Sequence, residues 1–394
     1  MLLLGVFLYM RLIHPLKLRL RYRIFWGILD VILMIGAGSA LPLTIMASRN
    51  NAYYNQYNLD VFLPAGYIFI TFLCLILAAI VIRDTIWFVY RIVLMIREYR
   101  HKTPDTEVIS DDQETLSRRQ FLKCAASAAA VGGAAALTPA AVYFARSRRI
   151  IKNIDIALNS IPSSLDGLRI VHLSDIHVGN TIRQQDIADI VAETNALNPD
   201  LIVITGDIAD GMPDHIGHWL DPMRELKSKY GTYFVTGNHD HMWDGTGWCK
   251  CVAGLNICVL DNEHKILEIN GTKLAIAGAI DVNGDFHRRK WRSDPQKALA
   301  NIPENVFKLM LVHQPASVDI SLRSGANLVL AGHTHGGQFW PMTYIIDALH
   351  KYSRGLYYID DKAVFISCGT GYWGPPLRFG VPPEIDVLTL KHKV

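Results

Sequence analysis

The chain has 394 residues, of which half are hydrophobic and only 19% are charged. This composition argues against a fully water-soluble protein, and the length allows a membrane region plus one domain. The net charge of +3 is too small to indicate a nucleic-acid partner, so none is expected. The spacing of the six cysteines fits neither a zinc ribbon nor the disulfide framework of a small secreted domain, which favours free thiols.

Residues 1–102 are predicted to form a membrane region with two to three transmembrane helices. The apolar runs at residues 24–47 and 62–82 each reach the length of about 20 residues that crosses a bilayer, while residues 2–15 are marginal. Basic residues cluster at 17–23 and again at 97–102. By the positive-inside rule both clusters are cytoplasmic.

A polar stretch at residues 103–117 is predicted to be a flexible cytoplasmic linker. The run that follows, Ser117-Arg118-Arg119-Gln120-Phe121-Leu122-Lys123, resembles a twin-arginine export signal, and the Ala/Gly-rich stretch after it resembles the hydrophobic region of such a signal. Residues 118–146 are therefore expected to be a signal and anchor that engages the twin-arginine export machinery. An ordinary fourth span beside an arginine pair is the competing interpretation.

This resemblance implies a bacterial inner (cytoplasmic) membrane protein whose C-terminal domain lies on the outer, periplasmic face. The internal position of the signal departs from the usual pattern. The basic residues Arg146, Arg148, Arg149 and Lys152, which would follow on the outer face, also oppose this orientation.

Residues 150–394 are predicted to form a separate domain. A helix is expected over residues 183–197, where Ile187, Ile190, Val191 and Thr194 recur at helical spacing. Short apolar runs suit strands buried on both faces, and strands that alternate with helices favour a layered α/β core. Five such runs end in polar residues, at 168–173, 201–204, 233–235, 308–312 and 328–330.

Each of these five runs is followed by aspartate, asparagine or histidine. A single histidine after a strand is more often a hydrogen-bonded core residue than a ligand. Five polar strand ends in one domain instead indicate a divalent metal site built from carboxylate, amide and imidazole groups. Gly206, Gly237 and Gly332 stand beside these residues and let the backbone turn sharply.

The polar segments resemble the motifs of the calcineurin-like metallophosphoesterase superfamily over roughly residues 168–390. The variant Gly-His-Thr-His-Gly-Gly-Gln, with the twin-arginine-like run, is similar to the YkuE-type and transmembrane branch. The resemblance implies an α/β fold, a four-layer β-sandwich flanked by helices, preceded here by the α-helical membrane region. The matching segments are Asp175-x-His177, Gly206-Asp207-x-x-Asp210, Gly237-Asn238-His239-Asp240, His313 and Gly332-His333-x-His335.

The resemblance also implies two divalent metal ions, drawn from Mn, Fe, Zn and Co. The ligands carried over are Asp175, His177 and His335 for one ion, Asn238, His313 and His333 for the other, and Asp207 as the bridge between both.

His239 follows a ligand without being one, and it is expected to donate a proton to the leaving oxygen. Asp240 is the candidate to orient the His239 ring. Asp210 is not followed by the arginine of some phosphatase branches, so support of the ligands is preferred to phosphate binding.

Two further residues, Asp281 and Arg378, are candidates either for support of the ligands or for substrate contact. Asp281 follows an apolar run at residues 273–279 and could line the cleft. Arg378 lies in an aromatic stretch with Trp340 and Trp373, which is either a rim for a substrate headgroup or a set of core aromatics beside a surface arginine.

The expected reaction is hydrolysis of a phosphate ester or pyrophosphate by attack of a metal-bridging hydroxide. Membrane tethering favours a lipid-linked phosphate and a role in lipid metabolism. One alternative is a cytoplasm-facing enzyme similar to the UDP-2,3-diacylglucosamine pyrophosphatases of lipid A synthesis, which requires the export signal to be spurious. Another is a non-catalytic membrane sensor, which the complete set of ligand motifs disfavours.

Overall fold

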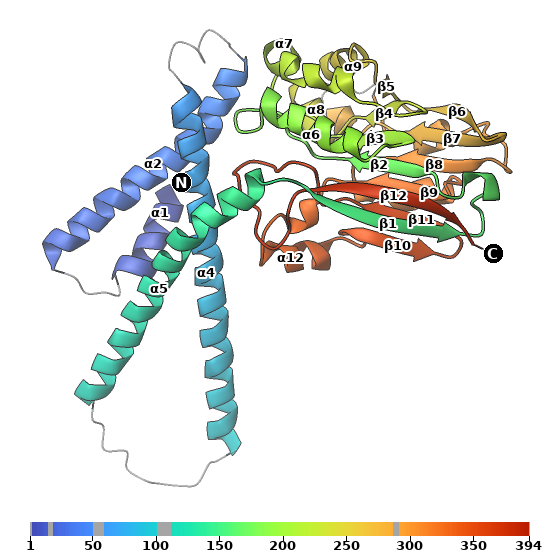
Figure 1. Ribbon diagram of the computed structural model, residues 1–394. Helices are drawn as coiled ribbons and strands as arrows, with labels where there is room; N and C mark the ends of the chain where they lie inside the picture. The colour runs from blue at the N-terminus through green and yellow to red at the C-terminus, as the bar shows by residue number, and fades with distance from the viewer. Residues whose placement is uncertain (1, 15–18, 50–58, 101–111, 287–290, 394) are drawn as a thin grey trace. The chain divides into compact units, whose positions relative to one another are not determined.

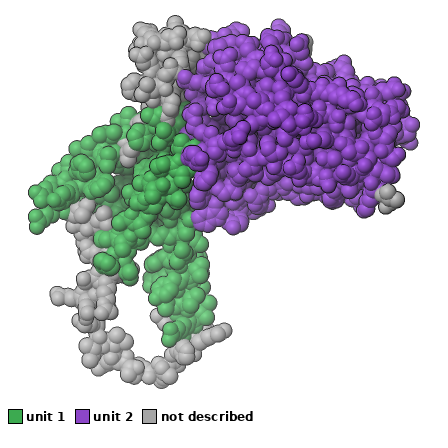
Figure 2. Space-filling model, in the orientation of Figure 1, with its two compact units in different colours: residues 1–43, 61–142 green, residues 44–60, 143–394 purple. Residues whose placement is uncertain are grey.

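The computed structural model describes residues 2–14, 19–49, 59–100, 112–286 and 291–393. The chain divides into two compact units, which Figure 2 distinguishes by colour. The helical unit comprises Met1–Leu43 and Val61–Val142, and the sheet unit comprises Thr44–Asp60 and Tyr143–Val394.

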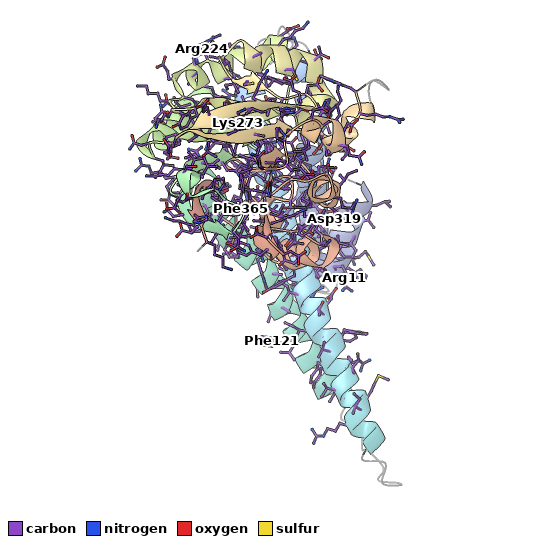
Figure 3. The ribbon with its side chains drawn as sticks, turned by 90° about the vertical axis from the view of Figure 1, so that its right-hand side faces the viewer. Arg11, Phe121, Arg224, Lys273, Asp319 and Phe365 are labelled. Carbon is purple, nitrogen blue, oxygen red and sulfur yellow. The ribbon has the colours of Figure 1, made fainter. Side chains whose placement is uncertain are left out.

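The helical unit consists of apolar helices. Its elements are α1 (Leu2–Leu8), a π-helical turn at Tyr9–Ile13, α2 (Leu20–Arg49), α4 (Leu59–Arg100) and α5 (Asp112–Arg146), whose last residues pass into the sheet unit. Within the described residues, two stretches are long and apolar enough to cross a membrane, Ala65–Arg97 and Cys124–Arg146. Phe121 on α5 points away from the ribbon and is largely exposed (Figure 3).

These helices follow the predicted apolar runs. The run at 62–82 lies in one continuous helix, α4, which extends to Arg100. The predicted linker at 103–117 lies outside the described residues as far as 111, and its remainder belongs to α5 and is helical.

The sheet unit is built from two six-stranded sheets, ordered β1-β12-β2-β3-β4-β5 and β10-β11-β9-β8-β7-β6 (Figure 1). The strands of the first sheet are β1 (Ile150–Leu158), β2 (Arg169–Leu173), β3 (Leu201–Thr205), β4 (Thr232–Val235), β5 (Cys258–Val259) and β12 (Glu384–His392). Those of the second are β6 (Glu263–Ile269), β7 (Thr272–Gly278), β8 (Phe307–Leu311), β9 (Leu328–Ala331), β10 (Gly355–Ile359) and β11 (Lys362–Ile366).

The sheet unit also contains short helices. The α-helices are α6 (Gln184–Ala196), α7 (Pro213–Ile216), α8 (Asn238–Trp243), α9 (Gly245–Ala253), α10 (Pro295–Leu299), α11 (Val318–Arg323) and α12 (Met342–Leu349). The 3-10 helices are η3 (Ser163–Leu165), η4 (Gly217–Glu225), η5 (Val282–Phe286), η6 (Pro315–Ser317) and η7 (His335–Gly337).

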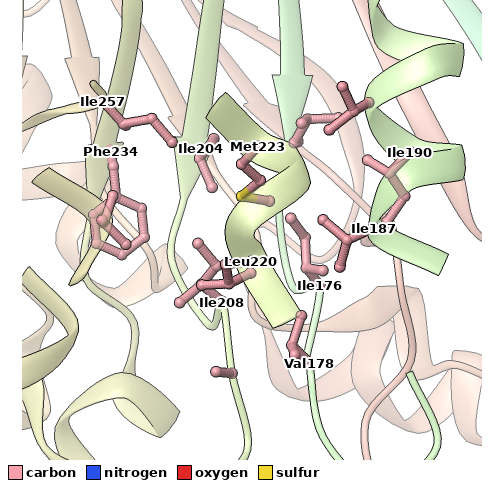
Figure 4. Packing of buried hydrophobic residues seen from close by; sticks show 14 of the residues in the cluster. Ile176, Val178, Ile187, Ile190, Ile204, Ile208, Leu220, Met223, Phe234 and Ile257 are labelled. Atoms are coloured by element: carbon pink, nitrogen blue, oxygen red, sulfur yellow. The ribbon is translucent and has the colours of Figure 1, made fainter. Parts of the chain in front are cut away.

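Three apolar clusters hold these layers together. Figure 4 shows the first, in which Ile187 and Ile190 of α6 and Leu220 of η4 cover the outer face of β2 to β4. A second cluster fills the space between the sheets and includes Phe365, which lies inside the unit in Figure 3. The third packs α10 and α11 on the second sheet. The resulting helix–sheet–sheet–helix order is the predicted four-layer α/β sandwich.

The parallel strands bring their carboxyl ends to one edge. β2, β3 and β4 run parallel to one another, as do β7, β8 and β9. The segments that follow β2, β3, β4, β8 and β9 carry the predicted ligands, and hydrogen bonds join them across the two sheets, such as His313 Nδ1 to the Thr205 carbonyl oxygen at 2.7 Å. We call this side of the sandwich the ligand edge.

Candidate metal centre

The backbone turns sharply at five of the predicted ligands. Non-glycine residues rarely adopt positive φ, and such strained residues, each costing about 1–3 kcal/mol, cluster at functional sites. The residues with this conformation are Asp175 (φ 53°), His177 (φ 54°), Asp207 (φ 51°), His333 (φ 72°) and His335 (φ 50°). The turns aim these side chains back across the ligand edge.

One group of ligand atoms is formed by Asp175, His177 and His335, all buried and all within 4.8 Å of one another. The Nε2 atoms of His177 and His335 are 3.2 Å apart, and His335 Nε2 is 3.4 Å from Asp175 Oδ1. Ser174 donates to the other carboxylate oxygen of Asp175 at 2.5 Å. Two imidazole nitrogens and a carboxylate that converge in this way suit a divalent ion.

A second group is formed by Asp207, His313 and His333. His313 Nε2 is 3.1 Å from Asp207 Oδ2, and His333 Nδ1 is 3.2 Å from His313 Nε2. Asn238 Oδ1 is 3.1 Å from His313 Nε2, so the amide oxygen faces the same point. This group therefore contains the three predicted ligands of the second ion together with Asp207.

Asp207 lies between the two groups. Its Oδ2 is 3.1 Å from Nε2 of His313 and 3.7 Å from Nε2 of His177, one histidine of each group. Burial alone would raise the pKa of Asp207, but the imidazoles of His313, His239 and His177 hold it well below its ordinary value. The carboxylate is thus charged and placed to contact an ion in either group.

His239 is oriented by Asp210. Its Nδ1 is 2.5 Å from Asp210 Oδ1, and the other carboxylate oxygen of Asp210 is 3.1 Å from Nδ1 of His177. One carboxylate therefore fixes both rings and leaves their Nε2 atoms turned away from it. Burial would lower the pKa of His239, but Asp210 and Asp207 outweigh burial and raise it to about 9.

Asp240 does not lie beside the His239 ring, although the sequence analysis made it the candidate to orient that ring. Its carboxylate accepts from the backbone N–H groups of Gly237 at 2.7 Å, Ile208 at 2.9 Å and Asp207 at 3.1 Å. Asp240 therefore ties the loop after β3 to the loop after β4. The prediction for Asp240 was wrong because Asp210, from the neighbouring loop, occupies the position beside the ring.

Arg378 is completely buried, so it is neither a surface arginine nor part of an exposed rim, and of the roles considered from the sequence its position favours support of a ligand. Its guanidinium donates to the carbonyl oxygens of Gly371 and His335, the latter at 3.2 Å, and lies 3.0 Å from Nδ1 of His335. Burial lowers the pKa of Arg378 to about 10. The side chain thus holds His335 and the loop at Gly371 in place from behind the ligand edge.

Asp281 lies buried beside the second group. One carboxylate oxygen accepts from the Asn283 backbone N–H at 2.8 Å and from the Gln314 side chain at 2.9 Å, while the other has no hydrogen-bond partner among the residues that the structure describes. Burial raises the pKa of Asp281 to about 6, against the influence of His313. An unpaired carboxylate oxygen so close to the ligands is consistent with support of the metal centre.

Glycine is required at two turns by lack of space. A Cβ atom at Gly237 would lie 2.2 Å from Asp207 Oδ1, and one at Gly332 would lie 2.2 Å from Asp175 Oδ2. Two ligand carboxylates therefore approach the backbone of neighbouring loops more closely than any side chain allows.

Sequence reasoning did not assign Gln338. Its side chain donates to the Trp373 carbonyl oxygen at 3.0 Å and accepts from the Trp373 backbone N–H at 2.9 Å. The Trp373 indole is half-exposed, and its centroid is 6.0 Å from that of the His239 ring. The sequence feature that could have identified Gln338 is its position directly after Gly336 and Gly337, which follow the ligand candidate His335.

A cavity of about 310 Å³ opens one helical turn beyond His239. It is lined by Met212, Asp214, His215, Met242 and Trp243. Met242 and Trp243 belong to α8, the helix that begins at Asn238 and carries His239. None of the predicted ligands is among the residues that line this cavity.

Similarity to known proteins covers the same part of the chain. The sequence profile of calcineurin-like phosphoesterases matches residues 168–337. A metallophosphoesterase of Caenorhabditis elegans is 36% identical over 264 residues, which are 64% of this chain and 54% of that protein. A transmembrane protein with a metallophosphoesterase domain from Danio rerio is 34% identical over 250 residues, 61% of this chain and 57% of that protein.

A bacterial relative matches over nearly its whole length. The metallophosphoesterase YkuE of Bacillus subtilis is 34% identical over 294 residues, which are 70% of this chain and 98% of YkuE. In contrast, the chain spans little more than half the length of the nematode and zebrafish relatives.

Proposed function

Because the chain belongs to the calcineurin-like phosphoesterase family, we propose that its sheet unit hydrolyses a phosphate ester or a pyrophosphate at a dinuclear metal centre. The observation that carries this proposal is the position of Asp207, whose Oδ2 atom faces His177 of one ligand group and His313 of the other. A single shared carboxylate between two such groups suits two ions held close together.

The residues of the two groups fit divalent ions of the borderline class, since they combine imidazole, carboxylate and amide oxygen and include no thiolate. Asp175, His177 and His335 would hold one ion, and Asn238, His313 and His333 the other. When bound, such ions supply charge neutralisation of the phosphoryl oxygens and a nucleophile at neutral pH.

The chain's own contribution to catalysis is proton transfer. We assign the proton of the leaving oxygen to Nε2 of His239, because Nδ1 of this ring is engaged by Asp210. Asp210 keeps the ring oriented and favours its protonated form. The half-exposed Trp373 indole, whose ring centroid is 6.0 Å from that of His239, would contact the part of a substrate that lies beside this ring.

The proposal includes a place in the cell. Residues 118–146 would act as a twin-arginine signal and anchor in a bacterial cytoplasmic membrane, with the sheet unit on the outer face. A lipid-linked phosphate is the proposed substrate class. The apolar stretches Ala65–Arg97 and Cys124–Arg146 and the relatives named as transmembrane proteins support membrane association.

The role of His239 can be tested by varying the leaving group. His239→Ala should slow hydrolysis of an ester with a poor leaving group by about 10²–10⁴-fold, because no acid remains to protonate the leaving oxygen. A p-nitrophenyl ester, whose leaving group needs no proton, should be affected much less. Steady-state rates on both esters provide the comparison, and equal losses would rule out proton donation by His239.

A further inference from the structure

The helix α12, which follows the last ligand motif, is apolar and largely exposed. Of its eight residues, Met342–Leu349, only Thr343 is buried. Tyr344 is 64% exposed, Ile345 49% and Leu349 73%, and Trp340 just before the helix is 41% exposed. Soluble surfaces rarely present so many adjacent large apolar side chains, which usually mark an interaction site.

The start of α12 is firmly fixed to the metal centre. A Cβ atom at Gly337 would lie 2.7 Å from the Thr343 Cα atom, so the helix packs directly on the backbone two residues after His335. The one charged residue of α12, Asp347, pairs with Arg354 at 2.7 Å. The exposed apolar face is therefore held rigidly beside the ligand edge.

The candidate membrane anchor leads into the sheet unit through a short connection. The last turn of α5 belongs to this unit, and Ala145 is buried in its first apolar cluster. Only residues 147–149 separate α5 from β1, which spans at most about 10 Å. Arg149 and Glu193 form an ion pair at 3.7 Å within this connection. The domain surface around the start of β1 must consequently lie close to the membrane that α5 enters.

The start of β1 is at the ligand edge. β1 runs parallel to β12, and β12 runs antiparallel to β2, so β1 begins where β2 ends. Ile150 pairs with Glu384, whose backbone N–H donates to Gly369 at 3.0 Å, and Thr370 in turn donates to the Ser174 carbonyl oxygen at 2.7 Å. Two strand spacings, about 10 Å, therefore separate the anchor's entry point from the first ligand loop.

α12 lies at this same end of the sheets (Figure 1). The Trp340 backbone N–H donates to the Phe379 carbonyl oxygen at 2.9 Å, and Phe339 forms bridges with Phe379 and Gly380, just before β12. The anchor, the ligand loops and the apolar helix thus share one edge of the sandwich.

We propose that α12, together with Trp340, is an interfacial helix that docks on the bilayer entered by α5, so that the ligand edge faces the membrane surface. Tryptophan and tyrosine beside aliphatic residues are the side chains expected at the level of lipid headgroups. Arg148, with a side chain 92% exposed, lies in the connection to the anchor and suits anionic headgroups. The inference deepens the proposed function and rests on its membrane anchoring, since the metal centre would open toward phosphate groups carried by lipids.

The test uses the full-length protein in vesicles of phosphatidylethanolamine and phosphatidylglycerol, treated with a photoactivated carbene reagent confined to the acyl chains. Peptide mapping should find label in residues 340–349 as well as in Ala65–Arg97. The internal control is Tyr358 on β10, which is 50% exposed but contacts Ala157 near the far end of β1. Its peptide should carry several-fold less label than α12.

A variant with both Tyr344→Glu and Leu349→Glu should lose the label in α12, because charged side chains withdraw from the acyl region. Both positions are exposed, so the fold should be retained. The proposal would be overturned if Ala65–Arg97 were labelled but α12 carried no more label than β10. That result would mean that something other than the bilayer, such as a second copy of the chain or another protein, covers the helix.

The variant should hydrolyse a soluble p-nitrophenyl ester in detergent at the parental rate. Absence of that turnover in the parent would contradict the proposed function and leave the labelling result valid.

Discussion

At the scale of single residues, the account of proton transfer depends on Asp210. Its two carboxylate oxygens contact Nδ1 of His177 and Nδ1 of His239, so one side chain orients a metal-ligand candidate and the candidate acid. Because a histidine is useful as an acid only in a fixed orientation and tautomer, loss of Asp210 should resemble loss of His239.

Asp210→Asn is therefore expected to slow esters with poor leaving groups by about 10²–10⁴-fold, the range typical of lost acid catalysis. Combining it with His239→Ala should add little, because residues that act as a unit have non-additive effects. Steady-state kinetics of the two single variants and the double variant measure this. Fully additive losses would show that Asp210 acts independently of His239.

Asp240→Asn is the matched control for Asp210→Asn. It makes the same exchange of a carboxylate for an amide close to the centre, but at a residue that does not contact the His239 ring. Because Asp240 accepts three backbone N–H groups with its two oxygens and an amide has only one oxygen, the exchange should leave a buried N–H unpaired and lower the free energy of unfolding by about 1–3 kcal/mol. Its dependence on the leaving group should stay parental. If Asp240→Asn instead reproduced the kinetics of His239→Ala, the assignment to Asp210 would be wrong.

The metal-ligand residues were easier to predict from the sequence than the residues that hold those ligands in position. Asp207 and His313 directly follow buried strands, and strand ends of parallel sheets meet at one edge, so their meeting could be predicted from the sequence. The choice between Asp210 and Asp240 beside His239 depends on the path of two loops, which no local pattern specifies. Arg378 supports His335 from 43 residues further along the chain, and only the folded structure places it there.

At the scale of elements, the turns after strands are what position the centre. Gly237 has φ −105° and ψ −179°, a conformation open to any residue, so its need for glycine comes from space alone. The backbone of the loop after β4 lies directly against the Asp207 carboxylate of the loop after β3.

Gly237→Ala should therefore displace the Asp207 carboxylate and lower the affinity for metal. The alanine itself should not strain the backbone, because its φ and ψ are allowed for any residue. We expect a loss of metal binding of about 10–100-fold, as for disturbed support of ligands, with the secondary structure retained. Metal titration monitored by calorimetry, with circular dichroism as the folding control, measures both. Unchanged metal affinity in a folded Gly237→Ala protein would show that the close approach has no role in the centre.

Strands that are buried on both faces could be predicted, and edge strands could not. β3 is almost entirely apolar, β2 and β8 are mostly apolar, and α6 shows its buried face at helical spacing. β1, β6 and β10 are partly exposed, with weak alternation that resembles a loop. The pairing of β1 with β12 joins residues more than 200 positions apart, so the entry of the anchor at the ligand edge required the structure.

At the scale of the whole molecule, the side of the membrane determines which substrates the sheet unit meets. The twin-arginine-like run predicts that a reporter active only outside the cytoplasm works when fused after Val394 and fails when fused near Thr106. Replacing Arg118 and Arg119 by lysine should abolish the signal of the first fusion, because the export machinery reads that pair. A cytoplasmic C-terminal reporter would favour the cytoplasm-facing pyrophosphatase and show that the basic residues from Arg146 to Lys152 set the orientation.

The central claim is that two divalent ions share Asp207. The most direct measurement is the metal content of the full-length protein by mass spectrometry, beside turnover of a p-nitrophenyl ester, for the parent and for Asp207→Asn. The account predicts two ions per parental chain, turnover lost on chelation and restored by metal, and a variant with fewer ions and almost no turnover. An Asp207→Asn protein that kept both ions and the parental rate would contradict it.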